Sequence, residues 1–358
     1  MAGASLAAAI GSRARVLLIE AESHPGYHAT GRSAAFWSEV YGGPDVQPLT
    51  TASGPFLRSP PTEFGGESFL RARGETWVAR RGDDAPLIEL EQRFAGHHVA
   101  MERVDPARLV PGIRSEWSEG LHIPSCTDID VARLHQAFLA AARRSGVELA
   151  SDSRLVAAEH GASGWRLTLS DGQQVSAAIL VNAAGAWADA VAKFAGIAPI
   201  GITPYRRTVV QLRVDPPVSA DLPLVQDARG RFYFKPEAGG RLWLSPHDET
   251  PMAPGDVAPD EIDIAQAIDR LTQVVDWRIE AVERKWAGLR SFAPDRLPVY
   301  GFAPGNRDFF WFAGQGGFGI QTAPAAAWIG AALLTGESLD AAVAHIDVDR
   351  YSPSRFGA

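Results

Sequence analysis

The chain has 358 residues, of which 46% are hydrophobic, so it can bury a large core and is long enough for two domains around a cleft. Its formal charge of -8 at pH 7, with no run of basic residues, excludes nucleic acid as a partner, because phosphate binding needs clustered Lys and Arg. The single cysteine, Cys126, excludes a disulfide framework and fits the reducing cytoplasm. No run of about 18 apolar residues is present, so we expect no integral membrane segment.

The N-terminal residues predict a helix followed by a buried strand. Ala2 to Ile10 is small and helix-forming, and residues 11 to 14 end that helix. Val16 to Ile19 is a continuous apolar run, which is typical of a strand buried on both faces. Glu20 follows directly after this strand. Its separation from Gly3 along the sequence is close to the spacing at which an acid binds the ribose of a dinucleotide. The same spacing also fits an ordinary surface glutamate at a strand end, so alone it is weak evidence.

These two elements form the second half of a βαβ dinucleotide-binding unit. In the complete unit a GxGxxG turn joins a first strand to the helix, and only Gly3 can belong to that turn here, as its third glycine. We therefore expect a dinucleotide-binding fold that is truncated at its N-terminus, and we predict that Met1 is an internal methionine of a longer protein. The alternative is a truncated, inactive descendant, because a sheet without its central strand exposes unpaired backbone.

The pattern of apolar and polar residues changes twice in the rest of the chain. The sequence predicts a helix at Val131 to Arg144, two hairpin-like strands, a buried strand and a helix that starts near Trp187. From residue 203 onward, alternation predicts an antiparallel sheet that is covered by a helix at Asp260 to Val275. The C-terminal part returns to a strand, the glycine-rich turn GGFGIQ and a small-residue helix at Ala323 to Leu334. The intervening antiparallel pattern predicts a second domain.

A series of motifs resembles one known family in order and spacing: PGYHATGRSAA, DIDVARLHQ, LVNAAGAWAD, YRRT, FYFKP, WAGLRSFAPD and GQGGFGIQT. The chain is similar over essentially its whole length to the FAD-dependent D-amino-acid oxidase superfamily, and it most closely resembles the bacterial D-arginine dehydrogenase branch. The resemblance implies an α/β fold with a Rossmann-like FAD domain, made of residues 1–40, 120–205 and 285–358. It also implies an antiparallel-sheet substrate domain, made of residues 41–119 and 206–284.

The resemblance implies that FAD is the cofactor. Glu20 and Ala21 would meet the adenosine, and the backbone of Leu155 would pair with adenine. The loop from residue 29 to 36 would follow the pyrophosphate and the flavin, where its hydroxyl and N–H groups are neutral donors. Residues 316 to 321 would face the pyrimidine edge of the flavin, where a helix N-terminus stabilises negative charge. The expected cofactor-binding residues are Ala2, Gly3, Glu20, Ala21, Ala29, Thr30, Gly31, Arg32, Ser33, Ala34, Ala35, Phe36, Leu155, Gly185, Gly316, Gly317, Phe318, Gly319, Ile320 and Gln321.

An amino-acid substrate brings a carboxylate, which needs fixed positive charge. The resemblance assigns Arg207 and Arg290 to a carboxylate clamp. It assigns Tyr41 and Tyr233 to phenol hydrogen bonds with the same carboxylate, and the carbonyl of Gly317 to the substrate amine. The alternatives are ordinary structural roles, since most arginines are solvated surface residues and most tyrosines are core aromatics with a polar edge.

Side-chain specificity rests on Glu75, which takes the place of the family acid that pairs with a cationic substrate and therefore favours arginine or lysine. The alternative is a solvated loop glutamate. Phe36 stands where the arginine enzyme has a histidine, and Gln226 replaces an apolar wall residue. Ser38 replaces a threonine and keeps its hydroxyl. The altered pocket puts the preference for arginine in doubt and allows a shift toward hydrophobic D-amino acids.

The histidines give no sign of acid-base or metal chemistry. His28 lies in the flavin loop, where we assign it a structural or cofactor contact. His24, His122 and His135 lack the spacing of a metal-binding motif, so we expect no metal site.

These assignments predict oxidative deamination of a D-amino acid by a cytoplasmic FAD enzyme: hydride transfer to flavin N5, followed by hydrolysis of the imine to a 2-oxo acid and ammonia. One alternative is a glycine- or sarcosine-type amine oxidase that uses oxygen. Another is a flavin-free, catalytically inactive truncated homologue. The sequence leaves the electron acceptor open, with a quinone or another carrier among the candidates.

Overall fold

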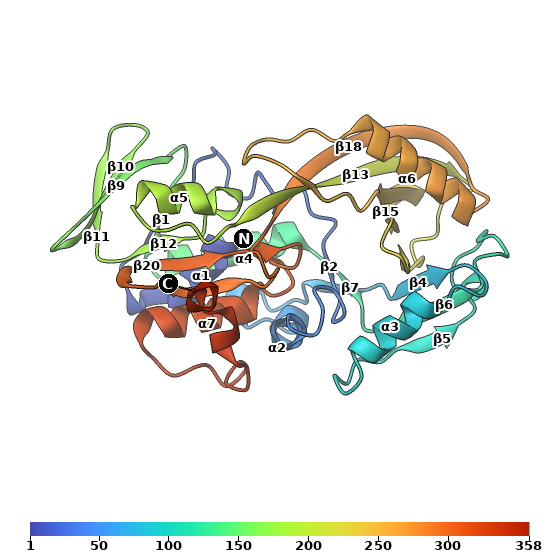
Figure 1. Ribbon diagram of the computed structural model, residues 1–358, viewed down its shortest axis with the longest axis horizontal. Coiled ribbons are helices and arrows are strands. Elements are labelled where there is room, and N and C mark those ends of the chain that lie inside the picture. Colours follow the sequence, from blue (N-terminus) through green and yellow to red (C-terminus); the bar gives the residue numbers. More distant parts are fainter. Residues whose placement is uncertain (358) are drawn as a thin grey trace.

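The computed structural model describes residues 1–357, and Figure 1 shows an α/β part around the two termini and a large sheet that extends away from it. In the α/β part, α1 (Ala2–Ile10) leads to β1 (Leu17–Ile19), which pairs in parallel with β8 (Glu148–Ala150). A second group contains β12 (Leu180–Asn182), which pairs in parallel with β20 (Asn306–Ala313), and β19 (Val299–Ala303), which pairs antiparallel with β20.

The expected parallel sheet is therefore present as two separate pieces. Within residues 1–357, β1 pairs only with β8 and β12 pairs only with β20. Residues of β1 and β12 line the same cavity, together with residues of α1. The expectation that a further strand precedes α1 stays a prediction.

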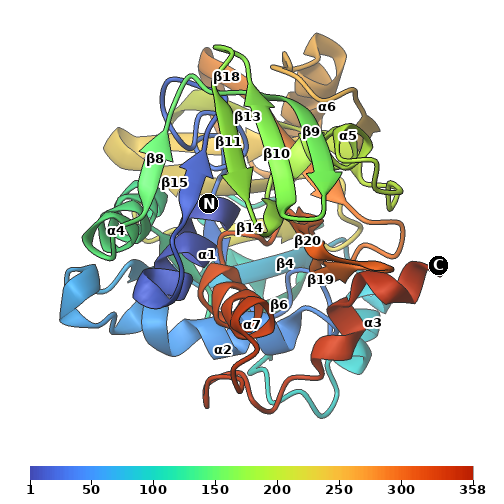
Figure 2. The ribbon, with the colours of Figure 1, turned by 90° about the vertical axis from the view of Figure 1, so that its left-hand side faces the viewer.

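Three helices cover the α/β part, and their bounds follow capping chemistry. α1 packs against α4 (Val131–Arg144) and α7 (Ala323–Thr335), as Figure 2 shows. The Asp130 side chain accepts a hydrogen bond from the backbone N–H of Arg133 at the start of α4. Gly336, with φ 72, ends α7 in the left-handed conformation that glycine adopts at low cost. The predicted helices at residues 2–10, 131–144 and 323–334 are confirmed.

The large sheet has the strand order β21-β18-β13-β16-β15-β14-β4-β6-β5, with β17 paired to β13. Its two longest strands, β13 and β18, form an antiparallel ribbon, and β14 and β4 are a parallel pair. The predicted antiparallel sheet is thus confirmed in most of its pairings. In this sheet the strands are β4 (Glu75–Ala79), β5 (Glu102–Val104), β6 (Glu119–Ile123), β13 (Thr203–Asp215), β14 (Leu224–Asp227), β15 (Tyr233–Glu237), β16 (Arg241–Ser245), β17 (Thr250–Pro251), β18 (Arg278–Phe292) and β21 (Gln315–Gly316).

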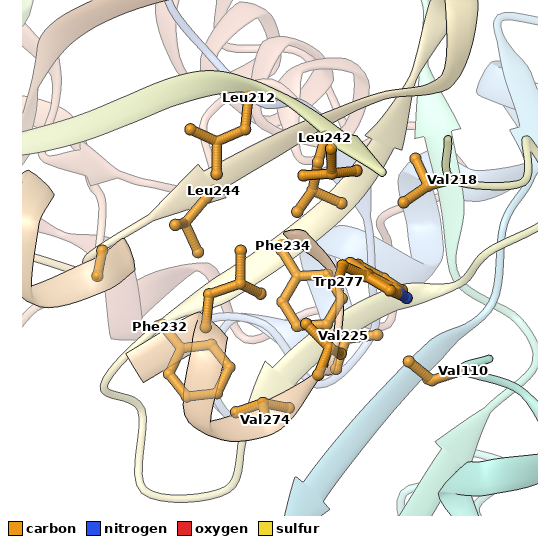
Figure 3. Packing of buried hydrophobic residues seen from close by; sticks show 14 of the residues in the cluster. Val110, Leu212, Val218, Val225, Phe232, Phe234, Leu242, Leu244, Val274 and Trp277 are labelled. Atoms are coloured by element: carbon orange, nitrogen blue, oxygen red, sulfur yellow. The ribbon is translucent and has the colours of Figure 1, made fainter. Parts of the chain in front are cut away.

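The helix α6 (Glu261–Val274) covers one face of this sheet, as predicted. Figure 3 shows Leu212, Leu244 and Phe234 of the sheet with Val274 of the helix in one buried cluster. Burial of such side chains stabilises the sheet by roughly 1.5–3 kcal/mol each. Arg207, Tyr233 and Arg290 lie on the face opposite this core and line the large cavity, whereas Arg206 of β13 pairs with Asp263 of α6.

Smaller elements complete the chain. The strands β2 (Phe36–Trp37), β7 (Thr127–Ile129) and β3 (Leu70–Ala72) form a small antiparallel sheet, and β9 (Leu155–Gly161), β10 (Gly164–Leu169) and β11 (Gln174–Ala177) form another. The remaining α-helices are α2 (Gln47–Arg58), α3 (Ala85–Arg93) and α5 (Ala188–Phe194). No helix within residues 1–357 has both the length and the apolar character that crossing a membrane requires.

Candidate functional site

A cavity of about 1410 Å³ extends from α1, β1 and β12 to the ribbon of β13 and β18. This volume exceeds the ≈ 300–1,000 Å³ of most small-ligand pockets, so the cavity has room for an extended ligand and a second small molecule. Apolar and small residues form most of the end next to α1. Guanidinium and phenol groups lie at the other end.

Most of the residues predicted from the sequence line this cavity. From the cofactor set these are Ala2, Gly3, Glu20, Ala21, Ala29, Thr30, Arg32, Ser33, Ala34, Ala35, Phe36, Leu155, Gly185, Gly316, Gly317, Gly319, Ile320 and Gln321. From the substrate set they are Tyr41, Arg207, Tyr233 and Arg290. Gly31, Phe318 and Glu75 do not line it.

Gly31 and Phe318 have structural contacts, and their assignment to the cofactor stays a prediction. The backbone N–H of Gly31 donates to the carbonyl of Gly26 at 2.8 Å, so this N–H group is not free for a ligand. A Cβ atom at residue 31 would lie 2.7 Å from the same oxygen, which explains the glycine. Phe318 packs against Val46 and Phe292 in a small buried cluster.

The loop from Ala29 to Phe36 is fixed by contacts from the large sheet. Arg32 donates to the carbonyl of Ala287 at 3.0 Å and forms an ion pair with Asp256 at 2.5 Å. Its own carbonyl accepts from the indole N–H of Trp286 at 3.0 Å. The Lys235 ammonium donates to the carbonyl of Ala34 at 3.1 Å. Arg32 thus ties the loop to the sheet, and the loop wall is pre-formed.

Close approaches of backbone define two further walls. A Cβ atom on Gly3 would lie 3.0 Å from Leu18 and 3.7 Å from Ala183, so α1 passes close to the ends of β1 and β12. A Cβ atom on Gly288 would lie 3.3 Å from Arg32, so β18 lies directly against the loop.

Gln321 is almost fully buried, and its side-chain amide forms hydrogen bonds with the backbone of Ser38 and Tyr41. It therefore fixes the turn that carries Tyr41.

Arg207 and Arg290 meet at the far end because of the register of β13 and β18. Arg207 lies opposite Gly288, so Arg290 is its diagonal neighbour on the same face of the ribbon. Both guanidinium groups contact the Glu249 carboxylate, at 3.4 Å from Arg207 and 2.5 Å from Arg290. Arg207 also donates to the carbonyl of Asp248 at 3.1 Å.

The two arginines retain unused binding capacity. Nη1 of Arg207 forms no hydrogen bond within residues 1–357 and is not among the fully buried atoms, an arrangement that an anionic ligand would complete. The Nε–H of Arg290 also has no partner among these residues, but it is fully buried behind the wall. Burial and the neighbouring charge of Arg290 lower the pKa of Arg207 to about 10, so Arg207 stays cationic at neutral pH.

Aromatic side chains and a glycine complete this end. Arg290 donates to the hydroxyl oxygen of Tyr41 at 2.9 Å. The ring of Phe36 lies 5.2 Å from that of Tyr41 and 6.2 Å from that of Tyr233. A Cβ atom at Gly317 would lie 2.0 Å from the Tyr41 hydroxyl, so only glycine fits beside it. The structure therefore brings the predicted clamp, both tyrosines and Gly317 together.

Glu75 lies behind the cavity wall. It is fully buried, accepts a hydrogen bond from the Ser38 hydroxyl at 2.5 Å, and accepts another from the amide of Gln226. Gln226 itself lines the cavity. A ligand therefore meets Gln226 before Glu75, and the sequence-based pairing of Glu75 with a substrate cation stays a prediction that this placement does not favour.

Stability should fall with rising pH because of Glu75. Burial raises the pKa of its carboxyl group from 4.5 to about 7, although hydrogen bonds from Ser38 and Gln226 oppose this shift. Between these two values the unfolded chain has lost the proton that the folded chain keeps, so stability of on the order of 3 kcal/mol, present below pH 4.5, is lost as the pH rises to about 7. Glu75→Gln should remove this loss from urea unfolding curves recorded at several pH values. Glu63→Gln, at an exposed position, should keep it, and equal pH dependence in wild type and Glu75→Gln would contradict the prediction.

Two polar residues at this end were not predicted. Glu249 joins the two clamp arginines, and His247 lines the cavity beside Tyr233, with ring centres 5.7 Å apart. Both come from the segment SPHDET after β16, which contains no recognisable motif. The unusual backbone of His247, with φ 59, is a feature of the structure that the sequence does not reveal.

His28 has structural partners. His28 contacts Glu22 at 2.8 Å and packs on Trp187, with ring centres 4.7 Å apart. Within residues 1–357 we find no group of three or more His, Cys, Asp or Glu side chains that could hold a metal ion.

The residues present fit a bound FAD. Glu20 stands at the end of β1, the hydroxyls of Thr30 and Ser33 line the cavity, and backbone approaches closely at Gly3 and Gly288. A dinucleotide needs these features: an acid for the ribose, neutral donors for phosphate, and small residues where backbone meets the ligand.

Comparisons with known proteins agree with this fit. Residues 1–333 match the family described as FAD dependent oxidoreductase. FAD-dependent oxidoreductase domain-containing protein 1 of Bos taurus is 31% identical over 169 residues, which cover 43% of this chain and 35% of that protein. The chain thus spans about a third of the length of this curated relative.

Solved structures show the same fold. Glycine oxidase from Geobacillus kaustophilus superimposes with a TM-score of 0.82 at 22% identity and covers 98% of this chain and 95% of its own. L-proline dehydrogenase from P. horikoshii gives a TM-score of 0.83 at 21% identity, with coverage of 99% and 94%. The chain belongs to the family of FAD dependent oxidoreductases, and FAD is its cofactor.

Proposed function

We propose that the protein oxidises D-amino acids to 2-oxo acids and releases ammonia. The observation that carries this proposal is the pair of cationic side chains, Arg207 and Arg290, in a wall of the cavity that also contains Tyr41, Tyr233 and Gly317. Two guanidinium groups match a carboxylate in charge and geometry. When bound, FAD supplies the two-electron acceptor for the reaction.

Each residue at this end has a defined task. Arg207 and Arg290 bind the substrate carboxylate. Because the Tyr41 oxygen accepts from Arg290, the hydroxyl hydrogen of Tyr41 is left to donate to the same carboxylate. Tyr233 adds a second phenol donor, and the carbonyl of Gly317 accepts a hydrogen bond from the substrate amine. These contacts hold the α-carbon in place, and positioning supplies most of the catalysis.

The reaction balances with water and a two-electron acceptor, a role that FAD would fill when bound. The substrate loses its α-hydrogen with two electrons and loses one proton from nitrogen, which gives the imine. Water adds to the imine carbon, and the C–N bond then breaks to yield the 2-oxo acid and ammonia.

A second candidate is oxidation of glycine, sarcosine or another small amine, with oxygen as acceptor. The position of Phe36, close to both Tyr41 and Tyr233, favours it because the ring narrows the space beside the clamp. The likeness to glycine oxidase also supports it, although at this identity the likeness shows the fold alone.

The deciding experiment compares substrates on the flavin-loaded protein. Purified protein with a visible flavin spectrum is assayed with both enantiomers of phenylalanine and arginine, and with glycine and sarcosine. Each assay is run first with an artificial acceptor and then with oxygen. We expect turnover of the D-enantiomers. Exclusive turnover of glycine or sarcosine would replace the proposal by the second candidate, and turnover of only the L-enantiomers would overturn the stereochemical assignment.

A further inference from the structure

We propose that Gln226 and His247 form a side-chain subsite that selects substrates whose side chain carries a neutral hydrogen-bond donor. The inference rests on the proposed function, because it takes the carboxylate clamp as the fixed end of the substrate. In this subsite two uncharged acceptor atoms contact the substrate side chain, in place of the charged Glu75 that the sequence analysis assigned to it.

The sheet places the two residues on either side of Tyr233. Gln226 of β14 lies directly opposite Tyr233 of β15, which in turn lies opposite Ser245 of β16, so the three side chains share one face. His247 follows two residues after Ser245 and packs edge-on against Tyr233. All but Ser245 line the cavity.

The amide of Gln226 is oriented by Glu75. Its N–H donates to the Glu75 carboxylate, which also accepts from Ser38. The amide oxygen of Gln226 accepts no hydrogen bond from residues 1–357 and is not among the fully buried atoms without a partner, so it is accessible at the cavity wall. Glu75 therefore acts as a positioning residue that turns an acceptor toward the ligand.

The imidazole of His247 offers a second acceptor. Its Nδ1 lies 2.6 Å from the carbonyl of Gly230, so Nδ1 carries a hydrogen, and in the corresponding neutral tautomer the lone pair is on Nε2. The left-handed backbone of His247 holds the ring in this position. Among residues 1–357, Nε2 has no hydrogen-bond partner.

The chemistry of the subsite follows from these two atoms. A side-chain amide has two N–H groups that can satisfy two acceptors, whereas an aliphatic side chain of the same shape leaves both acceptors without partners. The flanking rings of Phe36 and Tyr233 provide the apolar surface for the carbon atoms of the side chain.

The test uses ligands that lack the amine and therefore bind without turnover. Succinamate corresponds to asparagine without its amine, and 4-methylpentanoate is the leucine counterpart of the same shape. Titration calorimetry on the flavin-loaded protein should show succinamate binding about tenfold more tightly. Gln226→Met should reduce this ratio to about one, whereas Gln92→Met, at an exposed position of α3 outside the cavity, should leave it unchanged. Glu75→Ala, which removes the acceptor of the Gln226 amide, should also reduce the ratio.

Three outcomes would overturn the inference. Equal binding of the two ligands by the wild type removes the subsite and leaves the clamp intact. Tighter binding of 5-aminopentanoate than of succinamate shows recognition of a cation. Failure of both carboxylates to bind removes the clamp, and with it both the proposed function and this inference.

Discussion

Replacement of Arg290 by glutamine should lower kcat/KM for an amino-acid substrate by about 100-fold or more. Removal of one partner from a buried, charge-assisted contact typically costs about 2–5 kcal/mol, and about 1.4 kcal/mol corresponds to a factor of ten. Arg290 contributes more than charge, since it also orients the Tyr41 hydroxyl and contacts Glu249.

A matched control separates this effect from a general change in charge. Arg213→Gln removes a guanidinium group from the exposed side of the same ribbon, where Arg213 contacts Glu280 and Glu283 near the surface. Steady-state kinetics should show little change in that variant. The calorimetric Kd of 4-methylpentanoate should rise in Arg290→Gln in parallel with KM. A normal Kd together with a low kcat would contradict the role of Arg290 in binding the carboxylate.

The local sequence predicted the elements that carry the cofactor cavity. The periodicity at 131–144, and the small-residue pattern at 323–334, each correspond to a helix of the expected extent. No helix was predicted at α2, whose sequence includes Pro55, or at α3. The aliphatic periodicity that marks α4 is weaker in α2, and a proline normally argues against a helix interior.

The contacts within the candidate site join residues that are far apart in the sequence, so local patterns could not predict them. Arg207 and Arg290 were predicted from motifs, but their meeting depends on the register of β13 with β18, which joins residues far apart in the sequence. The Glu249 contact depends on a second long-range pairing, that of β17 with β13. For Gly31 the local motif suggested a free N–H group, whereas the fold of the loop directs that group to Gly26. Glu75 lies on β4, but Gln226 on the neighbouring strand separates it from the cavity.

The division into a cofactor-binding and a substrate-binding part stays a prediction, but one buried ion cluster connects the two regions. Asp128 of β7 lies 2.6 Å from the Lys235 ammonium of β15 and 2.5 Å from the Arg73 guanidinium. Lys235 also donates to the carbonyl of Ala34 in the cofactor loop. All three charged groups are largely buried, so the cluster depends on Asp128 to balance two cations.

Asp128→Asn should therefore destabilise the protein by about 3–5 kcal/mol, because it leaves Lys235 and Arg73 without their shared anion. Lys235→Met should cost less than half as much, since Asp128 keeps its contact with Arg73 and the methionine retains the apolar volume of the lysine stem. The double variant should be more stable than Asp128→Asn alone, because it no longer buries an unpaired ammonium group. Urea unfolding of the three variants measures these differences.

Release of flavin links the same cluster to function. The Lys235 contact with Ala34 holds the loop that lines the cofactor cavity, so Lys235→Met should release FAD faster than wild type although it is the milder change in stability. Flavin fluorescence after dilution follows this release. Equal loss of stability in Lys235→Met and Asp128→Asn would show that the lysine, and not the shared anion, dominates the cluster. Unchanged FAD release in Lys235→Met would show that the loop is held by Arg32 and Trp286 without the ammonium group.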